Sequence, residues 1–368
     1  MSVVIKSNQK STKNMGSLLG VGPSDYKLLA NFNLGIYIDK SENILKDTAF
    51  SDMFLFKRAS NAVYIGDSNQ LVTVREDEPR FQLGEDGTRR LLMSTAKTEL
   101  LNNPYSPATQ TVTIDDKGYV YLRVKGTGQA VLSGAAIDTA GDNQLIAKEG
   151  ELGVAKIVEG GGSLTITVTG SLSVFGMSKA SSVSASTDFT PNGDTKTAAD
   201  TLEVDPILAD KLLKASPAFT MVITYRESLS SSTSTAKSSI LAFVESTERN
   251  AYEGLYVSRT GGSNPRLSGD LLKGTSNSQV SKILKYEATG TQTRKIAVSF
   301  SSADTNFRVA SNGTVYQSDT YTPTPIAAKR ILISTDNAFL RQTYNTEIES
   351  LAFYDYAMTD SQLLEITS

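Results

Sequence analysis

Residues 50–101 read FSDMFLFKRASNAVYIGDSNQLVTVREDEPRFQLGEDGTRRLLMSTAKTELL. Short apolar runs alternate here with polar and Gly-containing turns, which is the pattern of β-strands joined by tight turns. The predicted strands cover residues 53–56, 62–65, 71–74, 81–83 and 91–93. The stretch contains no His, no Cys and no cluster with metal-ligand spacing. It therefore predicts a structural β block rather than a catalytic one.

The composition of the whole chain excludes or argues against several classes of function. Its 368 residues include no Cys and no His, which excludes thiolate and imidazole metal sites, a Cys nucleophile and a Ser–His triad. The net charge is -3 and the Lys and Arg residues are scattered, which argues against a nucleic-acid partner. No apolar run approaches the ~20 residues of a membrane span. The N-terminus lacks the apolar core of a secretory signal, and the absence of Cys fits assembly in a reducing cytosol.

Five short motifs follow one another in this stretch: Phe56–Lys57–Arg58–Ala59–Ser60, Val63–Tyr64, Glu78–Pro79–Arg80–Phe81, Leu91–Leu92 and Thr98–Glu99–Leu100–Leu101. Their order and spacing resemble a module of bacteriophage virion proteins. In those proteins a Phe–Thr–Arg–Ala–Ser segment leads to a Pro–Arg–Phe turn and an Asn–Leu–Leu exit. Here Lys57 stands in place of the usual threonine and Glu99 in place of the usual asparagine.

Residues 1–31 differ in composition from the rest of the chain. They are rich in Lys, Ser, Asn and Gly and hold too few apolar side chains for a core of their own. One interpretation is a disordered tail. The other, which the phage resemblance favours, is an extended arm that anchors to the virion, with its apolar start added as a strand to a partner's sheet. The anchoring residues would be Val3, Val4, Ile5, Lys6, Lys10 and Lys13.

The middle of the chain predicts a small β-sandwich. Residues 119–124 alternate, with Val120, Leu122 and Val124 on one face of a strand. Further strands separated by Gly turns follow at the spacing typical of a sandwich. This region resembles the carbohydrate-binding-module-like sandwich that follows the signature block in the phage proteins. A Ser/Thr/Asp cluster at residues 181–197 predicts a linker.

The last part of the chain predicts a larger β-sandwich. It combines a strong strand at residues 219–225, an Asn312–Gly313 hairpin turn, a late strand at 349–355 and a C-terminal helix with a Thr359/Gln362 capping box. Asp205 and Pro206 predict the start of another helix. This order resembles the laminin-G/concanavalin-A-like lectin fold.

Together these observations predict an all-β chain with two antiparallel β-sandwiches after an extended N-terminal arm. The predicted units are an anchoring arm (1–31), a signature β block packing on the following sandwich (32–103), a small β-sandwich (104–180), a linker (181–197) and a laminin-G/concanavalin-like sandwich (198–368).

Three kinds of site can be weighed on this sequence. A glycosidase needs two facing carboxylates, but Glu76, Asp77 and Glu78 are adjacent and fit a solvated turn, as do Glu245, Glu248 and Glu253 around a predicted loop. No cofactor is expected. Calcium is the one metal whose oxygen ligands the chain offers, although neither candidate loop has EF-hand spacing. The weak calcium candidates are Asp138, Asp142, Asp188 and Asp194.

Carbohydrate binding would use exposed aromatic rings beside polar donors. The chain has no Trp, so Tyr would have to supply the stacking surface. The alternative for each Tyr is a half-buried ring whose hydroxyl is satisfied at the surface. The candidate sugar-binding residues are Tyr252, Tyr256, Tyr321, Arg259 and Asn264.

The resemblance implies a non-enzymatic virion structural protein, a head fibre, decoration protein or tail fibre component. We expect it in the virion after assembly in the host cytoplasm, bound to other virion proteins of capsid, tail or collar through its arm. The family's fibres and spikes imply a homotrimer, and the lectin-like sandwich implies contact with host-surface glycans. Two alternatives stay open, a glycan depolymerase or hydrolase using carboxylates of the C-terminal sandwich, and a lectin-like adhesin.

Overall fold

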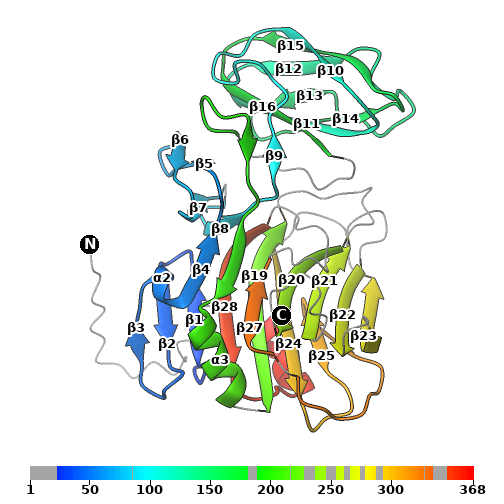
Figure 1. Ribbon diagram of the computed structural model, residues 1–368. Coiled ribbons are helices and arrows are strands. Elements are labelled where there is room, and N and C mark those ends of the chain that lie inside the picture. The colour runs from blue at the N-terminus through cyan, green and yellow to red at the C-terminus, as the bar shows by residue number, and fades with distance from the viewer. Residues whose placement is uncertain are drawn as a thin grey trace.

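The computed structural model describes residues 23–84, 86–180, 189–215, 217–227, 237–245, 254–260, 266–273, 278–286, 293–326, 328–334 and 346–368. These residues form two β lobes, a large sandwich and a smaller one set on one end of it (Figure 1). Every strand pair in both lobes is antiparallel. The prediction of an all-β chain of antiparallel sandwiches is therefore confirmed.

The first layer of the large sandwich is a ten-stranded sheet. Its centre is the pair β19 (Ala218–Glu227) and β28 (Thr346–Tyr354), in which Val222 lies opposite Ala352. One side continues through β24 (Thr293–Ser301), β25 (Arg308–Ser311) and β26 (Thr314–Gln317). The other side carries β1 (Leu28–Asn31), β2 (Ile36–Asp39), β3 (Lys46–Asp47), β7 (Arg80–Leu83) and β8 (Arg89–Met93).

The second layer is a seven-stranded sheet. In order it contains β23 (Ser278–Tyr286), β22 (Arg266–Lys273), β21 (Gly254–Thr260), β20 (Lys237–Val244), β27 (Arg330–Ile333), β18 (Thr201–Val204) and β4 (Phe54–Lys57). Apolar side chains of both sheets form one core between the layers. Phe219 connects the two layers, with its ring centroid 4.5 Å from that of Phe243 and 5.7 Å from that of Phe353.

The early strands belong to the large sandwich, which corrects two predicted boundaries. Strand β1 pairs with β28, and Leu28, Leu29 and Ala30 are fully buried, so Tyr26 and residues 28–31 belong to the core and not to an arm. Strand β4 pairs with β18, and β8 pairs with the start of β28. Much of the signature block thus completes the C-terminal sandwich instead of packing on the small one. Strand order along the chain does not reveal such pairing, because any strand with an apolar face can complete a distant sheet.

The small sandwich consists of a four-stranded and a three-stranded sheet. The first orders β10 (Gln110–Ile114), β15 (Gly162–Thr169), β12 (Gln129–Ser133) and β13 (Ile146–Lys148). The second orders β14 (Gly153–Ile157), β11 (Gly118–Gly126) and β16 (Leu172–Ala180). Val120, Leu122 and Val124 are buried in its core, as their alternation predicted.

The small sandwich is an insertion within the large one. The chain leaves the large sandwich after β8, runs up through β9 (Lys97–Thr98) and returns through β17 (Lys196–Thr197) to β18. Strands β9 and β17 pair with each other and form a neck between the lobes (Figure 1). The predicted linker is therefore corrected in part. Within its described residues 189–197, Phe189, Thr190 and Thr197 are buried, while residues 181–188 lie outside the described residues.

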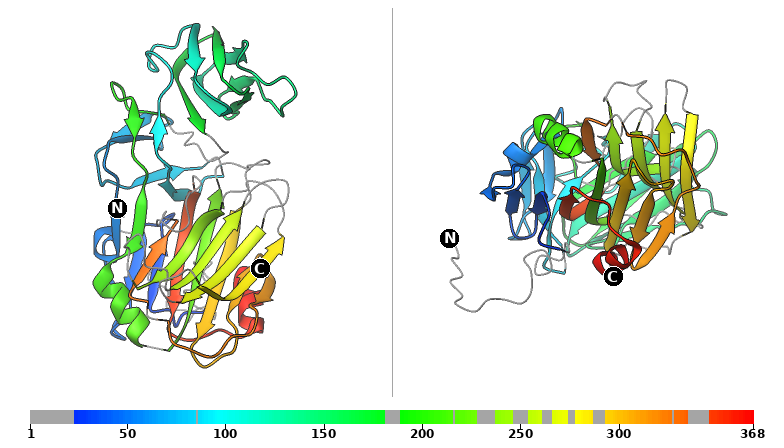
Figure 2. Two further views of the ribbon diagram at one scale, coloured as in Figure 1. Left: turned by 45° about the vertical axis from the view of Figure 1, so that its right-hand side comes forward. Right: turned by 90° about the horizontal axis from the view of Figure 1, so that it is seen from below.

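Three helices complete the described structure, and two of them follow the predicted caps. Helix α3 (Pro206–Ala215) starts at Asp205, whose Oδ1 accepts hydrogen bonds from the backbone N–H of Ile207 and Leu208 at 3.0 and 3.1 Å. Helix α4 (Asp360–Thr367) has the Thr359/Gln362 capping box and packs on the outer face of the ten-stranded sheet (Figure 2). A short helix, α2 (Phe50–Met53), precedes β4.

Candidate functional site

The base of the neck is built around one buried carboxylate, that of Asp200. Its Oδ1 lies 3.2 Å from Arg58 Nη1 and its Oδ2 lies 2.6 Å from Arg80 Nη2, and all three side chains are fully buried. Oδ2 also accepts the backbone N–H of Ser94 at 2.7 Å. The two arginines come from the Lys57–Ser60 and Glu78–Phe81 motifs, so these motifs meet at a single residue far along the chain.

The two arginines also donate hydrogen bonds to backbone carbonyls of neighbouring segments. Arg58 Nη2 donates to the carbonyls of Arg75 and Glu78 at 2.6 and 2.9 Å, which closes the turn between β6 (Leu71–Val74) and β7. Arg80 Nη1 donates to the carbonyl of Val63 on β5 (Ala62–Ile65) at 3.2 Å. The buried charges therefore form a network that joins Val63, the turn at residues 75–78, Ser94 and Asp200, and these hydrogen bonds lower the cost of burial.

A second buried carboxylate, Glu99, holds the upper part of the neck. Its Oε1 accepts the backbone N–H of Met177 on β16 at 2.7 Å and those of Leu100 and Leu101 at 3.1 and 3.2 Å. Its Oε2 lies 3.1 Å from Lys97 Nζ, with both side chains 2% exposed. Glu99 follows strand β9 directly, and its hydrogen bond to Met177 ties this strand to β16 of the small sandwich.

None of these buried charged residues was predicted as a site residue from the sequence. Arg58, Arg80 and Glu99 lie in the motifs that resemble the virion module, but no role was predicted for them. Asp200 ends a Lys–Thr–Ala–Ala–Asp run with no periodicity, and its partners precede it by 142 and 120 positions. No local pattern marks such a residue, although two motif arginines that face a buried site require a carboxylate.

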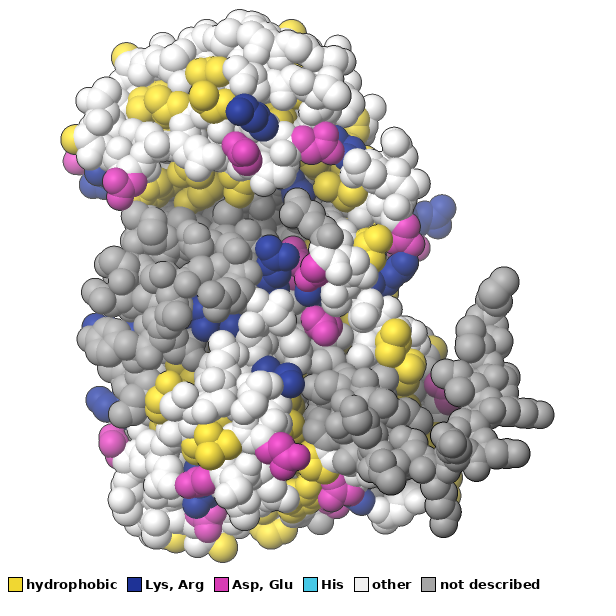
Figure 3. Space-filling view, turned by 180° about the vertical axis from the view of Figure 1, so that it is seen from behind, with side chains coloured by type: hydrophobic (Ala, Val, Ile, Leu, Met, Phe, Trp, Pro, Cys, Tyr) yellow, Lys and Arg dark blue, Asp and Glu magenta, His cyan; other side chains and the backbone are white. Residues whose placement is uncertain are grey.

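A groove of about 460 Å³ lies beside the neck, between the two lobes. Its walls come from both sandwiches and from the β5–β6 hairpin, and Figure 3 shows Lys, Arg, Asp and Glu side chains close together at this waist. Its lining residues include Asp67, Asn69, Gln82, Arg123, Glu149, Glu151, Arg226 and Glu347.

The charges in the groove are partly paired. Glu149 accepts from Lys125 Nζ and from the backbone N–H of Gly126, each at 3.0 Å. These hydrogen bonds, that of Lys125 first, hold the pKa of Glu149 below its ordinary value of 4.5. Asp67 is bonded to Arg89. The groove is thus a polar, water-accessible surface and offers hydrogen-bonding groups from both lobes.

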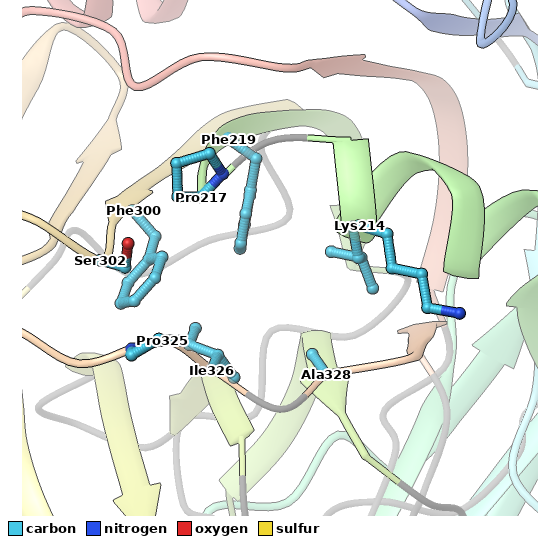
Figure 4. A pocket seen from close by; sticks show the side chains of 9 residues that line it. Lys214, Pro217, Phe219, Phe300, Ser302, Pro325, Ile326 and Ala328 are labelled. Carbon is cyan, nitrogen blue, oxygen red and sulfur yellow. The ribbon is translucent and has the colours of Figure 1, made fainter.

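A pocket of about 290 Å³ opens at the other end of the large sandwich. Phe219 and Phe300 lie on one side of it, Pro325 and Ile326 on the opposite side, and Ala328 and Lys214 at one end (Figure 4). Its lining residues are Leu213, Lys214, Pro217, Phe219, Phe300, Ser302, Pro325, Ile326 and Ala328.

The polar groups at this pocket are few. The backbone N–H of Ser302 donates to the carbonyl of Pro217 at 2.9 Å, which fixes the wall. Within the residues that the structure describes, the Ser302 hydroxyl bonds to no protein group. The Lys214 ammonium points away from the cavity (Figure 4), and it pairs with Asp210 at 2.5 Å.

The three predicted sugar-binding residues that the structure describes are buried. Tyr256 and Arg259 lie on β21 and are 0% and 3% exposed, and Tyr321 is 7% exposed. The Tyr321 hydroxyl donates to the carbonyl of Ser301 at 3.4 Å, beside the pocket, and burial raises the pKa of Tyr321 to about 12. Tyr252 and Asn264 lie outside the described residues. Sugar binding at these five positions stays a prediction.

The candidate calcium loops carry ordinary turn and ion-pair chemistry where they are described. Asp138 pairs with Lys156 at 2.8 Å and accepts the backbone N–H of Ala140. Asp142 is exposed and Asp194 is half-buried, while Asp188 lies outside the described residues. Among the described residues no group of three or more Asp or Glu side chains is placed to hold a metal ion.

Three of the described carboxylates weighed for glycoside hydrolysis form ion pairs or hydrogen bonds within the protein. Asp77 pairs with Lys57 at 2.8 Å, and Glu78 accepts the backbone N–H of Arg75 at 2.9 Å. Glu245 lies 3.5 Å from Lys329, and Glu248 and Glu253 lie outside the described residues.

The candidate anchoring residues also lie outside the described residues. They are Val3, Val4, Ile5, Lys6, Lys10 and Lys13. Among the helices that the structure describes, none has the length and apolar character to cross a membrane.

Comparison with known proteins finds no matching family model and no matching curated protein. Among solved structures, the carbohydrate-binding module of the Ruminococcus gnavus intramolecular trans-sialidase, bound to α2,3-sialyllactose, shares 13% identity with a TM-score of 0.35. It covers 41% of this chain and 83% of its own. A leech intramolecular trans-sialidase shares 12% identity over 41% of this chain and 23% of its own, with a TM-score of 0.35.

The receptor-binding domain of botulinum neurotoxin type G shares 10% identity over 45% of this chain and 39% of its own, with a TM-score of 0.33. At these identities and TM-scores the likeness assigns this chain neither a family nor a ligand.

Proposed function

We propose that this chain is a non-enzymatic structural protein of a bacteriophage particle, a head fibre, decoration protein or tail fibre component that presents two β-sandwiches to host-surface glycans. The observation that carries the proposal is the neck. The motifs that resemble the virion module supply Arg58, Arg80 and Glu99. Arg58 and Arg80 form buried ion pairs with Asp200 at the base of the neck, and Glu99 accepts a hydrogen bond from the small sandwich at its upper part. A displayed domain benefits from such a fixed attachment.

The N-terminal residues 1–22 would anchor the protein to the particle. The test is cryo-EM of phage particles assembled with the full chain and with a variant lacking residues 1–22. This truncation keeps Tyr26 and strand β1, which are core. We expect decoration by the full chain and none by the truncated one.

Each other outcome has a definite meaning. Equal decoration by both chains would contradict the anchoring role and place the attachment elsewhere. Decoration by neither chain on any particle would contradict the virion function itself. Sedimentation of the free protein tests the expected homotrimer, and a clean monomer would count against it.

A further inference from the structure

We propose that the β5–β6 hairpin fixes the angle between the two lobes, and that one hydrogen bond at its tip opens to let the small sandwich swing on the neck. This interlobe hydrogen bond joins Asn69, in the turn between β5 and β6, to Lys125 on β11 of the small sandwich. The hairpin lies between the lobes, beside the neck (Figure 1). The motion belongs to the fold itself and does not depend on the partners named in the proposed function.

The hairpin is fixed to the large sandwich. The backbone N–H of Ile65 donates to Gln82 Oε1 on β7 at 3.2 Å, and Asp67 is bonded to Arg89 on β8. Strands β7 and β8 belong to the ten-stranded sheet, whose apolar side chains form part of the main core. The hairpin is therefore expected to move with the large lobe and to offer its tip as a fixed point.

The small sandwich meets the hairpin through one polar and one apolar contact. Asn69 Oδ1 accepts a hydrogen bond from Lys125 Nζ at 2.7 Å. Val63 of the hairpin is buried together with Val174 of β16 and with Phe189. Apolar burial is non-directional, whereas a hydrogen bond weakens steeply as its angle changes. The apolar contact can therefore persist while the small lobe turns, and the interlobe hydrogen bond selects one angle.

The neck supplies the pivot. Strands β9 and β17 contribute two residues each to the pair that they form. The ion pairs of Asp200 fix the lower end of the neck in the large lobe, and Glu99 fixes its upper end to β16. An isolated pair of strands is only marginally stable by itself, so we expect bending to occur between these two fixed ends.

Lys125 keeps a charged partner when the interlobe hydrogen bond opens. Its Nζ also lies 3.0 Å from Glu149 Oε1, and Glu149 Oε2 accepts the backbone N–H of Gly126 in the same lobe. Asn69 is exposed, so water can replace the ammonium as the partner of its amide oxygen. Opening therefore leaves no buried charge without a partner, which keeps the free-energy difference between the closed and the open state small.

Opening would widen the groove between the lobes. The groove is lined by Asp67 and Asn69 of the hairpin and by residues 149–152 of the small sandwich. Because the interlobe hydrogen bond joins these two walls, its loss allows them to separate. The volume of about 460 Å³ is therefore that of the closed state.

Distance measurements between two spin labels test the proposal. The chain has no Cys, so two introduced Cys residues take the labels without competition. Thr167→Cys places one on β15 of the small sandwich and Thr314→Cys places the other on β26 of the large one, both at exposed positions. Double electron–electron resonance on the full-length labelled protein should give one narrow distribution of distances.

Two variants remove the interlobe hydrogen bond and one control does not. Asn69→Gly deletes the amide and suits the left-handed backbone of this turn, where φ is 59°. Lys125→Met deletes the ammonium and keeps an apolar stem. Each should shift the ratio of closed to open molecules about tenfold toward the open state, since a hydrogen bond to a charged group is worth that much, and so broaden the distribution. Lys117→Met breaks an exposed ion pair with Glu159 inside the small sandwich and should leave it narrow.

A narrow distribution in both Asn69→Gly and Lys125→Met would overturn the proposal, because the neck alone would then fix the angle. A distribution that is already broad in the labelled parent, or that broadens equally in Lys117→Met, would overturn it as well. Circular dichroism checks that each variant is folded. Asn69→Gly changes only an exposed turn residue, so its result decides the matter even if Lys125→Met fails to fold.

Discussion

At the scale of single residues, we expect the buried carboxylate of Asp200 to contribute strongly to the stability of the fold. It is fully buried between Arg58 and Arg80, and its two carboxylate oxygens each lie close to one of the guanidinium groups. Asp200→Asn should lower the free energy of unfolding by about 3–5 kcal/mol, because it removes the carboxylate charge that lies between two buried guanidinium groups. Chemical denaturation measures the change. Glu159→Gln, which removes the exposed partner of Lys117, is the control and should leave stability unaltered. Equal free energies of unfolding for the two variants would contradict a stabilising role of the ion pairs that Asp200 forms with Arg58 and Arg80.

Glu149 gives a prediction on pH at the same scale. Its hydrogen bonds to Lys125 and Gly126 lower its folded pKa below 4.5. The contribution to stability is therefore present above pH 4.5 and is lost as the pH falls through the lower folded pKa, where the unfolded chain binds more protons. An NMR titration of the Glu149 carboxyl should show a midpoint below 4.5, and Lys125→Met should raise that midpoint. A midpoint at or above 4.5 in the unaltered protein would contradict the described pair.

At the scale of elements, helix α3 depends on its N-cap. Asp205 accepts two backbone N–H groups, and Leu208, Ala209 and Leu212 of the helix are buried in the main core. Asp205→Ala should lower the free energy of unfolding by about 1 kcal/mol. Asp210→Ala, in the middle of the same helix, is the matched control and should cost less, because Ala is the better helix former there. Thermal unfolding distinguishes them, and an equal loss at both positions would contradict the capping role.

The elements also show what the sequence alone can predict. Alternation placed the strand at residues 119–124, and cap residues placed the starts of α3 and α4. The Asn312–Gly313 turn also forms as predicted, with positive φ at both residues between β25 and β26. These features are local, so their residue types determine them. The pocket at Phe219 and Phe300 was not predicted, because its walls meet only after the two sheets pack together.

At the scale of the whole molecule, the pairing of strands that are far apart along the chain could not be predicted from the sequence. Leu29 lies opposite Ala352 and Leu202 opposite Phe56, and nothing in either local pattern specifies such partners. The predicted domain boundaries at residues 31, 103 and 198 assume that each domain is one continuous segment. The large sandwich instead contains strands that precede the inserted lobe and strands that follow it. An insertion of this kind keeps the neck strands β9 and β17 adjacent.

The central claim is that the large sandwich is one domain interrupted by the small one. The most direct test compares the unfolding of two shortened chains. In the first, Asn-Gly replaces residues 99–195, which joins Thr98 to Lys196 as a two-residue hairpin on the β9–β17 pair. The second contains residues 198–368 alone. We predict cooperative unfolding for the first chain and none for the second, which lacks β1, β4 and β8. Cooperative unfolding of residues 198–368 alone, with stability equal to that of the first chain, would contradict the claim.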